Sequence, residues 1–219
     1  MRVNHSLFHL SGILLLGCAA STAGGATVLF NNLSDTPTSN NGIYGNGLGT
    51  DGSVYQSFSN GATSLLLDDL QLELAGAITS TGSFTIGLYS DSSTKPNTLL
   101  LSIATVSDSS LALSAAVYDF SVANYALSAN TRYWIGLVGT STSSHWEGTP
   151  VQAGDTGTST EFIQQTTGVV YPSDTNFAYM MTVTAVTAQS GVPEPSTGLL
   201  LGAGLAAAWC ARRARKDPA

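Results

Sequence analysis

The segment Asp69-Leu70-Gln71-Leu72-Glu73-Leu74 decides the fold class. Its leucines alternate with polar residues, so an extended backbone turns every leucine to one face and every polar side chain to the other. The same period of two recurs in four further segments. They are residues 83–88, 117–122, 133–138 and 181–185. One apolar face and one wet face are typical of antiparallel strands that are half buried.

Turn-forming residues separate these alternating segments, and two short segments, 54–58 and 168–171, are further strand candidates. Long stretches rich in Gly, Asn, Ser and Thr are expected to be loops. They are residues 31–53, 90–97 and 139–159. Short strands between such turns predict an all-β, antiparallel β-sandwich or jelly-roll-like body over residues 27–186. This body is followed by a small, flexible spacer at residues 187–191.

Length and composition limit what the body can be. The chain has 219 residues, of which 43% are hydrophobic and 10% charged, which suits one folded core and excludes charge-driven disorder. Residues 27–191 hold twelve acidic residues but only two basic ones, a net charge of −10, so nucleic acid is excluded as a partner. Both cysteines, Cys18 and Cys210, lie in the end segments, and the body therefore has no disulfide and no cysteine metal site.

The N-terminus, residues 1–26, is interpreted as a signal peptide with a signal helix. Arg2 supplies the positive start, Leu7–Leu16 the apolar core, and small residues follow. Cleavage is expected after Ala23 or Ala26, because signal peptidase needs small side chains before the cut. An alternative is lipidation of Cys18, since the preceding Leu-Leu-Gly resembles a lipobox.

The C-terminus predicts a transmembrane helix with a cytoplasmic anchor. Residues 198–211 carry no charge, and a basic cluster follows at once. With part of the preceding segment, the apolar run is just long enough to span a bilayer. The cluster holds this end in the cytoplasm by the positive-inside rule, which leaves the body outside. Its members are Arg212, Arg213, Arg215 and Lys216.

The order of parts in residues 192–219 resembles the PEP-CTERM sorting signal of Gram-negative bacteria that produce exopolysaccharide. Val192-Pro193-Glu194-Pro195 comes first, then the apolar run, then the arginines. The two prolines keep the motif extended and outside the helix, where a protease can engage its backbone. The resemblance implies that exosortase, an integral membrane cysteine protease, is a transient partner. It also implies an exported protein that passes from the inner membrane, with its body in the periplasm, to the cell surface or extracellular matrix.

The body itself is similar to the choice-of-anchor R domain. The similarity rests on Gly82–Asp91, Lys95–Asn97 and Leu127–Gly136. That family occurs on bacterial proteins with different surface-attachment tails. The resemblance implies an all-β extracellular body and assigns no activity and no functional residues.

Candidate catalytic residues are few. His145 is the only histidine left after signal removal, and a Ser-His-Asp arrangement would have to use it. Asp68, Asp69, Glu73 and Glu147 are the carboxylates from which a glycoside hydrolase could draw an acid pair. The competing interpretation is that the histidine lies in an exposed loop and the acids form a solvated strand face.

Two kinds of binding site are also considered. Asp51 and Asp91 lie in oxygen-rich loops that suit a structural calcium ion, although neither loop matches an EF-hand, and turn hydrogen bonds explain them equally. Trp134 and Trp146 would bind carbohydrate if their rings were exposed, because sugars stack on aromatic faces. The alternative is that Trp134 packs inside the sandwich and Trp146 covers an edge.

The sequence therefore predicts a non-enzymatic, exported surface or matrix protein that needs no cofactor. The first alternative is a carbohydrate-binding module for exopolysaccharide. The second is a secreted glycoside hydrolase.

Overall fold

A computed structural model of the chain describes residues 25–44, 52–78, 81–150, 161–163 and 177–188. The chain divides into two compact units, one of residues 24–190 and one made of residues 1–23 and 191–219. The second unit lies outside the described residues, and so do the predicted signal helix, the predicted membrane helix and the strand candidate at 168–171.

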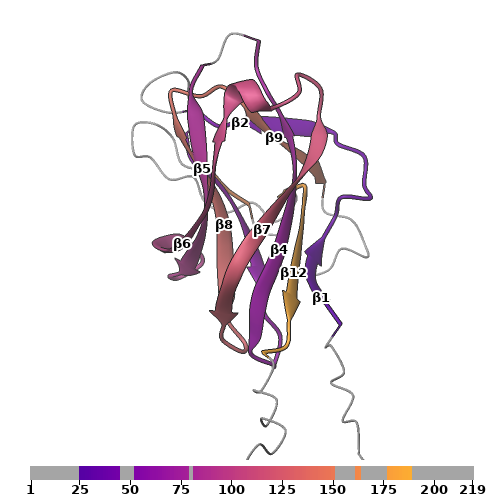
Figure 1. Cartoon of the computed structure of the whole chain (residues 1–219), viewed down its shortest axis with the longest axis vertical. Helices are drawn as coiled ribbons and strands as arrows, with labels where there is room; N and C mark the ends of the chain where they lie inside the picture. The colour runs from indigo at the N-terminus through magenta and orange to yellow at the C-terminus, as the bar shows by residue number, and fades with distance from the viewer. Residues whose placement is uncertain (1–24, 45–51, 79–80, 151–160, 164–176, 189–219) are drawn as a thin grey trace, which may run out of the picture. The chain divides into compact units, whose positions relative to one another are not determined.

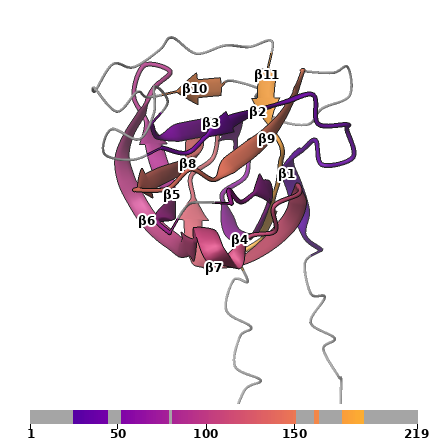
Figure 2. The same cartoon turned by 90° about the horizontal axis from the view of Figure 1, so that it is seen from above.

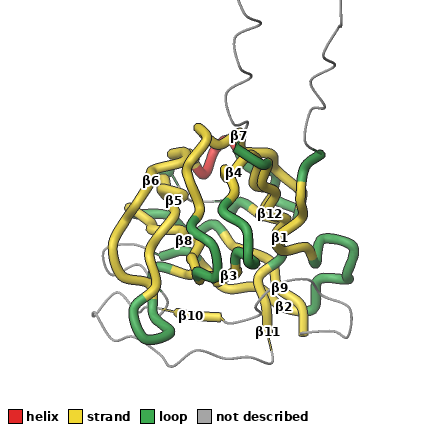
Figure 3. The backbone as a smooth tube through the Cα atoms, turned by 90° about the horizontal axis from the view of Figure 1, so that it is seen from below, coloured by secondary structure: helices red, strands yellow, loops and turns green. Residues whose placement is uncertain are grey.

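Strands make up nearly all the regular structure of the described residues (Figure 3). In chain order the elements are β1 (Thr27–Asn31), β2 (Ser39–Gly42), β3 (Val54–Ser59), β4 (Leu65–Ala75), β5 (Ser83–Asp91), β6 (Pro96–Ser107), the 3-10 turn η1 (Asp108–Ser110), β7 (Ala116–Leu127), β8 (Arg132–Thr140), β9 (His145–Pro150), β10 (Glu161–Ile163), β11 (Phe177–Tyr179) and β12 (Met181–Val186). Because η1 is the one helical element of the described residues, the all-β prediction is confirmed for this part of the chain.

The strands form two sheets in which every pairing is antiparallel (Figures 1 and 2). The seven-stranded sheet runs β1-β12-β4-β9-β11, with β2 beside β9 and β7 beside β4. The five-stranded sheet runs β10-β3-β8-β5-β6. The strand order departs widely from the chain order, so most pairings join segments that are far apart in the sequence. The predicted antiparallel sandwich is confirmed.

Strand β4 follows the alternation that the sequence predicts. Leu70, Leu72 and Leu74 are fully buried, whereas Asp69 and Glu73, on the other face, are only partly covered. Each leucine of this kind stabilises the fold by about 1.5–3 kcal/mol relative to an exposed one. Neighbours flank β4 on both sides, because β12 pairs with residues 66–72 and β7 with residues 65–74. The strand is therefore central to the seven-stranded sheet.

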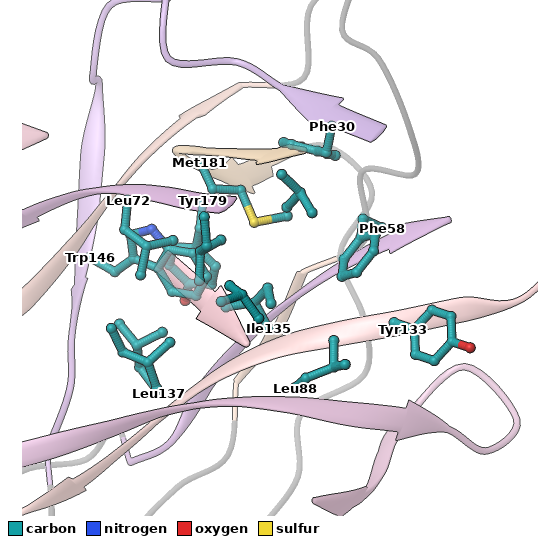
Figure 4. Close-up of a cluster of buried hydrophobic side chains, with 14 of the residues drawn as sticks. Phe30, Phe58, Leu72, Leu88, Tyr133, Ile135, Leu137, Trp146, Tyr179 and Met181 are labelled. Atoms are coloured by element: carbon teal, nitrogen blue, oxygen red, sulfur yellow. The ribbon is translucent and has the colours of Figure 1, made fainter. Parts of the chain in front are cut away.

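The core lies between the two sheets (Figure 4). The seven-stranded sheet contributes Phe30 and Met181, and the five-stranded sheet contributes Phe58, Leu88 and Ile135, all five of them fully buried. The ring of Phe58 also stacks on Tyr133, with 5.9 Å between the ring centroids. A single apolar layer thus joins both sheets.

Three segments differ from the sequence prediction. The expected loop at residues 139–159 contains strand β9, because His145–Pro150 pairs with β2, β4 and β11. The Ser, Thr and Gly content of this stretch predicts a loop. Strand β6 (Pro96–Ser107) was not predicted, since the continuous run Leu99–Leu101 lacks alternation; these leucines lie on an edge strand. The expected loop at residues 31–53 likewise contains β2.

Candidate functional site

Trp146 is a core residue of the seven-stranded sheet. Its indole is 0% exposed and stacks on Tyr179, with ring centroids 4.6 Å apart and an angle of 15° between the planes. Its Nε1 donates a hydrogen bond to the Met180 carbonyl oxygen at 3.0 Å, and Asn41 Nδ2 donates to the Tyr179 hydroxyl at 2.8 Å. Both faces and the polar edge are thus occupied by protein. Sugar stacking on Trp146 would require an exposed ring, and in this structure no ring face meets solvent.

Trp134 is also fully buried, on the opposite side of the five-stranded sheet from the main core. It forms a small cluster with Tyr55, which the half-buried Tyr89 joins. The two tyrosine rings meet edge-to-face with centroids 5.2 Å apart, and they lie where a Cβ on Gly136 would be, 2.4 Å from Tyr55 Cδ1. Only glycine leaves room for this cluster. The exposed ring that sugar stacking on Trp134 would require is therefore also absent.

The surroundings in this cluster raise the pKa values of both tyrosines. Burial, followed by the neighbouring Tyr55, raises the pKa of Tyr89 to about 12. Burial also raises the pKa of Tyr55, against the opposing effect of hydrogen bonds with Ser53 and Tyr89. Both phenols therefore stay neutral at any physiological pH and act as hydrogen-bonding groups only.

Asp91 is a partner of Trp134. Trp134 Nε1 donates a hydrogen bond to Asp91 Oδ1 at 2.8 Å, which fixes the carboxylate at the end of β5. The turn that follows is closed by backbone hydrogen bonds between Ser92 and Lys95. Within the described ranges, no group of three or more His, Cys, Asp or Glu side chains is placed to hold a metal ion. Calcium at Asp91 stays a prediction, and Asp51 lies outside the described residues.

A row of polar side chains crosses the outer face of the seven-stranded sheet. The register places Asn31, Thr182, Gln71 and Asp119 side by side on β1, β12, β4 and β7. Thr182 Oγ1 donates to Asn31 Oδ1 at 2.8 Å, and Gln71 Nε2 donates to Asp119 Oδ1 at 2.5 Å. Cross-strand pairs of this kind stabilise a sheet. The side chains of this row therefore form hydrogen bonds with each other across the strands.

The candidate acids Asp68 and Asp69 lie next to this row. The pKa of Asp69 is raised above its ordinary value, and burial is the largest cause. The negative charges of Asp119 and Asp68 raise it further. The sheet thus brings three aspartates together, two of which are adjacent in sequence and the third 50 residues away. Like charges at close range disfavour ionisation, so Asp69 holds its proton more tightly than an isolated carboxyl would.

Glu73 and Glu147 come together where β4 meets β9. The Glu73 N–H donates to the Met180 carbonyl oxygen, and the Met180 N–H donates to the Glu147 carbonyl oxygen. Burial raises the pKa of both carboxyls; for Glu73 the charge of Glu147 adds to the effect, and for Glu147 a hydrogen bond from Asn40 opposes it. The two side chains are thus close enough for the charge of Glu147 to act on Glu73.

His145 lies two residues from Glu147 on β9, so alternation places both side chains on the same face. Burial lowers the pKa of His145 below its usual value, which keeps the imidazole neutral at pH 7. The histidine is therefore on a strand and partly covered, rather than in an exposed loop.

Asp108 was missed by sequence reasoning and is the most enclosed carboxylate of this region. It is 3% exposed; Oδ1 accepts hydrogen bonds from the hydroxyls of Thr142 and Ser144, and Oδ2 accepts one from the Gly82 N–H at 3.0 Å. It joins the end of β6 to the β8–β9 turn and the start of β5. The sequence shows only a single aspartate between serines, and the partners are 26 to 36 residues away.

The C-terminal residues lie outside the described part of the chain, and comparison with known families bears on them. The chain carries a PEP-CTERM protein-sorting motif at residues 191–216. This motif indicates an exported protein that is held at the membrane and recognised by exosortase before processing. No curated protein matches the chain.

The motif covers Val192–Pro195 and the basic cluster Arg212, Arg213, Arg215 and Lys216. The predicted sorting signal is thereby confirmed as a motif, and the similarity of residues 82–136 to the choice-of-anchor R domain stays a prediction. Among the described residues, none belongs to a helix long and apolar enough to span a bilayer.

Proposed function

We propose that this chain is a non-enzymatic surface or extracellular-matrix protein of a Gram-negative bacterium. Its signal peptide starts export, its C-terminal helix holds it briefly in the inner membrane with the body in the periplasm, and exosortase then releases it to the cell surface. The observation that carries the proposal is the sorting motif at residues 191–216, which follows the all-β body in the sequence.

The chemistry of the body supports an extracellular role. A low content of charged residues leaves a surface of hydroxyls and amides, which suits a hydrated polymer environment. The body has no cysteine, so it folds without disulfides, and its single buried core suffices at this size. The polar groups best defined by the structure, the row across the seven-stranded sheet and the Asp108 network, bond to other groups of the protein.

The experiment is mass spectrometry of the protein recovered from hosts with and without exosortase. With exosortase, we expect a mature chain that has lost residues 1–23 or 1–26 and the basic C-terminal cluster. Without it, we expect a chain that retains the cluster and stays in the membrane. A P193A/P195A variant is expected to behave like the host without exosortase, and Q189A, in the spacer, serves as its matched control. A secreted chain that still carries Arg212–Lys216 overturns the proposal.

A glycoside hydrolase remains the second candidate because Glu73 and Glu147 form a carboxyl pair with raised pKa values. A general acid requires such a shift near neutral pH. Incubation with the host's exopolysaccharide, followed by a reducing-end assay, tests it. Release of reducing ends that disappears in both E73Q and E147Q supports hydrolysis, and no release removes this candidate.

A further inference from the structure

Strands β6 and β7 form one side of the body, which we call the β6–β7 flank, and they follow each other in the chain with η1 between them. Among the described strands, β6 pairs only with β5 and β7 only with β4, so each is an edge of its own sheet. Figures 2 and 3 show the two strands as neighbours on the perimeter of the body. This side is therefore bounded by a free edge of each sheet.

Large hydrophobic side chains that pack against the main core but stay partly exposed gather on this flank. Of the seven such side chains in the described part of the chain, six lie on β6 and β7, and the seventh is Phe177 on β11. The six are Leu100, Leu101, Ile103, Tyr118, Phe120 and Tyr125. Leu99 and Val117, on the same two strands, are 48% and 50% exposed. Exposed hydrophobics that are grouped in this way mark an interaction surface, whereas scattered ones do not.

The flank carries almost no charge, although the body is strongly acidic. Between Pro96 and Leu127 only Asp108 and Asp119 are charged, and both accept hydrogen bonds from the chain itself. The other ten acidic residues of the body lie outside this stretch. A partner recognised by its charge would have to be basic, and it would be drawn to those acids rather than to the flank. The flank therefore selects an apolar surface.

A second copy of the chain offers such a surface. Two acidic bodies repel each other, and the repulsion is smallest when they meet through their least charged stretch. A two-fold axis sets the same patch against itself, so apolar side chains face apolar side chains. Strands of 12 residues are about 40 Å long, and a two-sheet side with its side chains is about 20 Å wide. The resulting area of about 800 Å² is what each partner contributes to a stable interface.

We propose that the β6–β7 flank is the contact surface of a homodimer, in which two copies meet flank to flank about a two-fold axis. The register of β6 against β5 shifts at several points, which bends the strand and disfavours a continuous ladder between copies. The contact is therefore made by side chains. This inference goes beyond the proposed sorting function and does not depend on it.

The test uses the full chain purified in detergent, at about 1 μM and about 100 μM, a range that covers micromolar association. Sedimentation equilibrium with density-matched detergent measures the oligomeric state, and hydroxyl-radical footprinting with mass spectrometry measures the oxidation of side chains. We expect the protein mass to double at the higher concentration, while oxidation of Tyr118, Phe120 and Tyr125 falls at least about twofold. Phe177, which is half-buried outside the flank, is the internal control and should be oxidised equally at both concentrations.

The disrupting variant is S102K/A123K, which places one lysine at an exposed position of β6 and one at an exposed position of β7. Its matched control is S34K/S39K, which adds the same charge at two exposed positions outside the flank. We expect S102K/A123K to weaken dimerisation at least about tenfold, because lysines of the two copies would be buried near each other without partners. The control variant should dimerise like the unaltered chain, and urea midpoints confirm that both variants fold.

The proposal is overturned if the chain stays monomeric at the higher concentration, or if S102K/A123K dimerises as well as the unaltered chain. Association through another segment leaves the oxidation of Tyr118, Phe120 and Tyr125 unchanged, and this result overturns it as well. A chain that exosortase fails to process, yet dimerises through the flank, contradicts only the sorting proposal.

Discussion

Thr27, the first residue of β1, lies directly opposite Ala185, the penultimate residue of β12, in the antiparallel register of these two strands. Strand β12 is also paired with the central strand β4 on its other side. The start of β1 and the end of β12 therefore lie side by side in the seven-stranded sheet. The residues that follow β12 leave the sheet next to the first residue of β1.

The sequence leaves only a short spacer between the described body and the sorting motif. Five residue steps separate Thr187 from Val192, and a fully extended chain spans about 17 Å over that length. We expect deletion of residues 189–191 to slow exosortase processing, because the sandwich would then obstruct the motif. The measurement is the ratio of processed to unprocessed chain in pulse-labelled cells.

Replacement of residues 188–191 by Gly-Ser-Gly-Ser is the control for spacer length, and normal processing is expected. If the deletion is processed as fast as the unaltered chain, spacer length does not govern access. If the replacement is as slow as the deletion, spacer sequence matters instead.

Trp146 is expected to be a stability residue. W146A removes the stacking on Tyr179 and the hydrogen bond to Met180, and it leaves a cavity between the sheets. The free energy of unfolding should fall by about 3–5 kcal/mol, as for other large aromatic residues in cores. Urea unfolding followed by tyrosine and tryptophan fluorescence measures this. A loss below about 1 kcal/mol would mean that the ring is not packed as described.

The Asp108 network should be cooperative. D108A leaves the buried hydroxyls of Thr142 and Ser144 without this acceptor, so we expect a loss of about 3 kcal/mol, whereas T142V should cost less. The double variant D108A/T142V should cost clearly less than the sum of the two single changes, because the second change removes a group that has already lost its partner. Additive losses in this double-mutant cycle would contradict the coupling.

Glu73 and Glu147 make stability depend on pH. Their pKa values are raised in the folded chain, so above the ordinary value of 4.5 the folded state keeps protons that the unfolded state releases. The free energy of unfolding should therefore fall as the pH rises from about 4.5 through the folded pKa values. E147Q is expected to flatten this dependence and to raise the urea midpoint at pH 7. D119N is a comparison on the same sheet outside the pair, and it should leave the contribution of Glu73 and Glu147 in place.

Several features were predictable because they depend on local order in the sequence. Alternation in residues 69–74 gave the correct faces of β4, since side-chain direction in a strand depends only on position along it. Strand β9 was not predictable in this way, because its composition does not alternate and its partner β2 is distant in the sequence. The edge strand β6 forms a hairpin with the preceding strand β5, and it was not predictable because the run Leu99–Leu101 does not alternate. Trp146 shows the consequence of missing β9. In an expected loop its ring was a candidate surface for sugar binding, whereas in strand β9 it stacks on Tyr179 and is a buried core residue.

By itself, the sequence determined the all-β class and the sorting motif, because a periodic pattern and a linear signal are both complete within a short stretch of chain. The tertiary structure decided which polar groups lie together: Glu73 with Glu147, and Asp108 with Thr142. It also buried both tryptophans of the body. Each of these facts arises from contacts between segments that are distant in the chain, and the pairing of the strands creates those contacts.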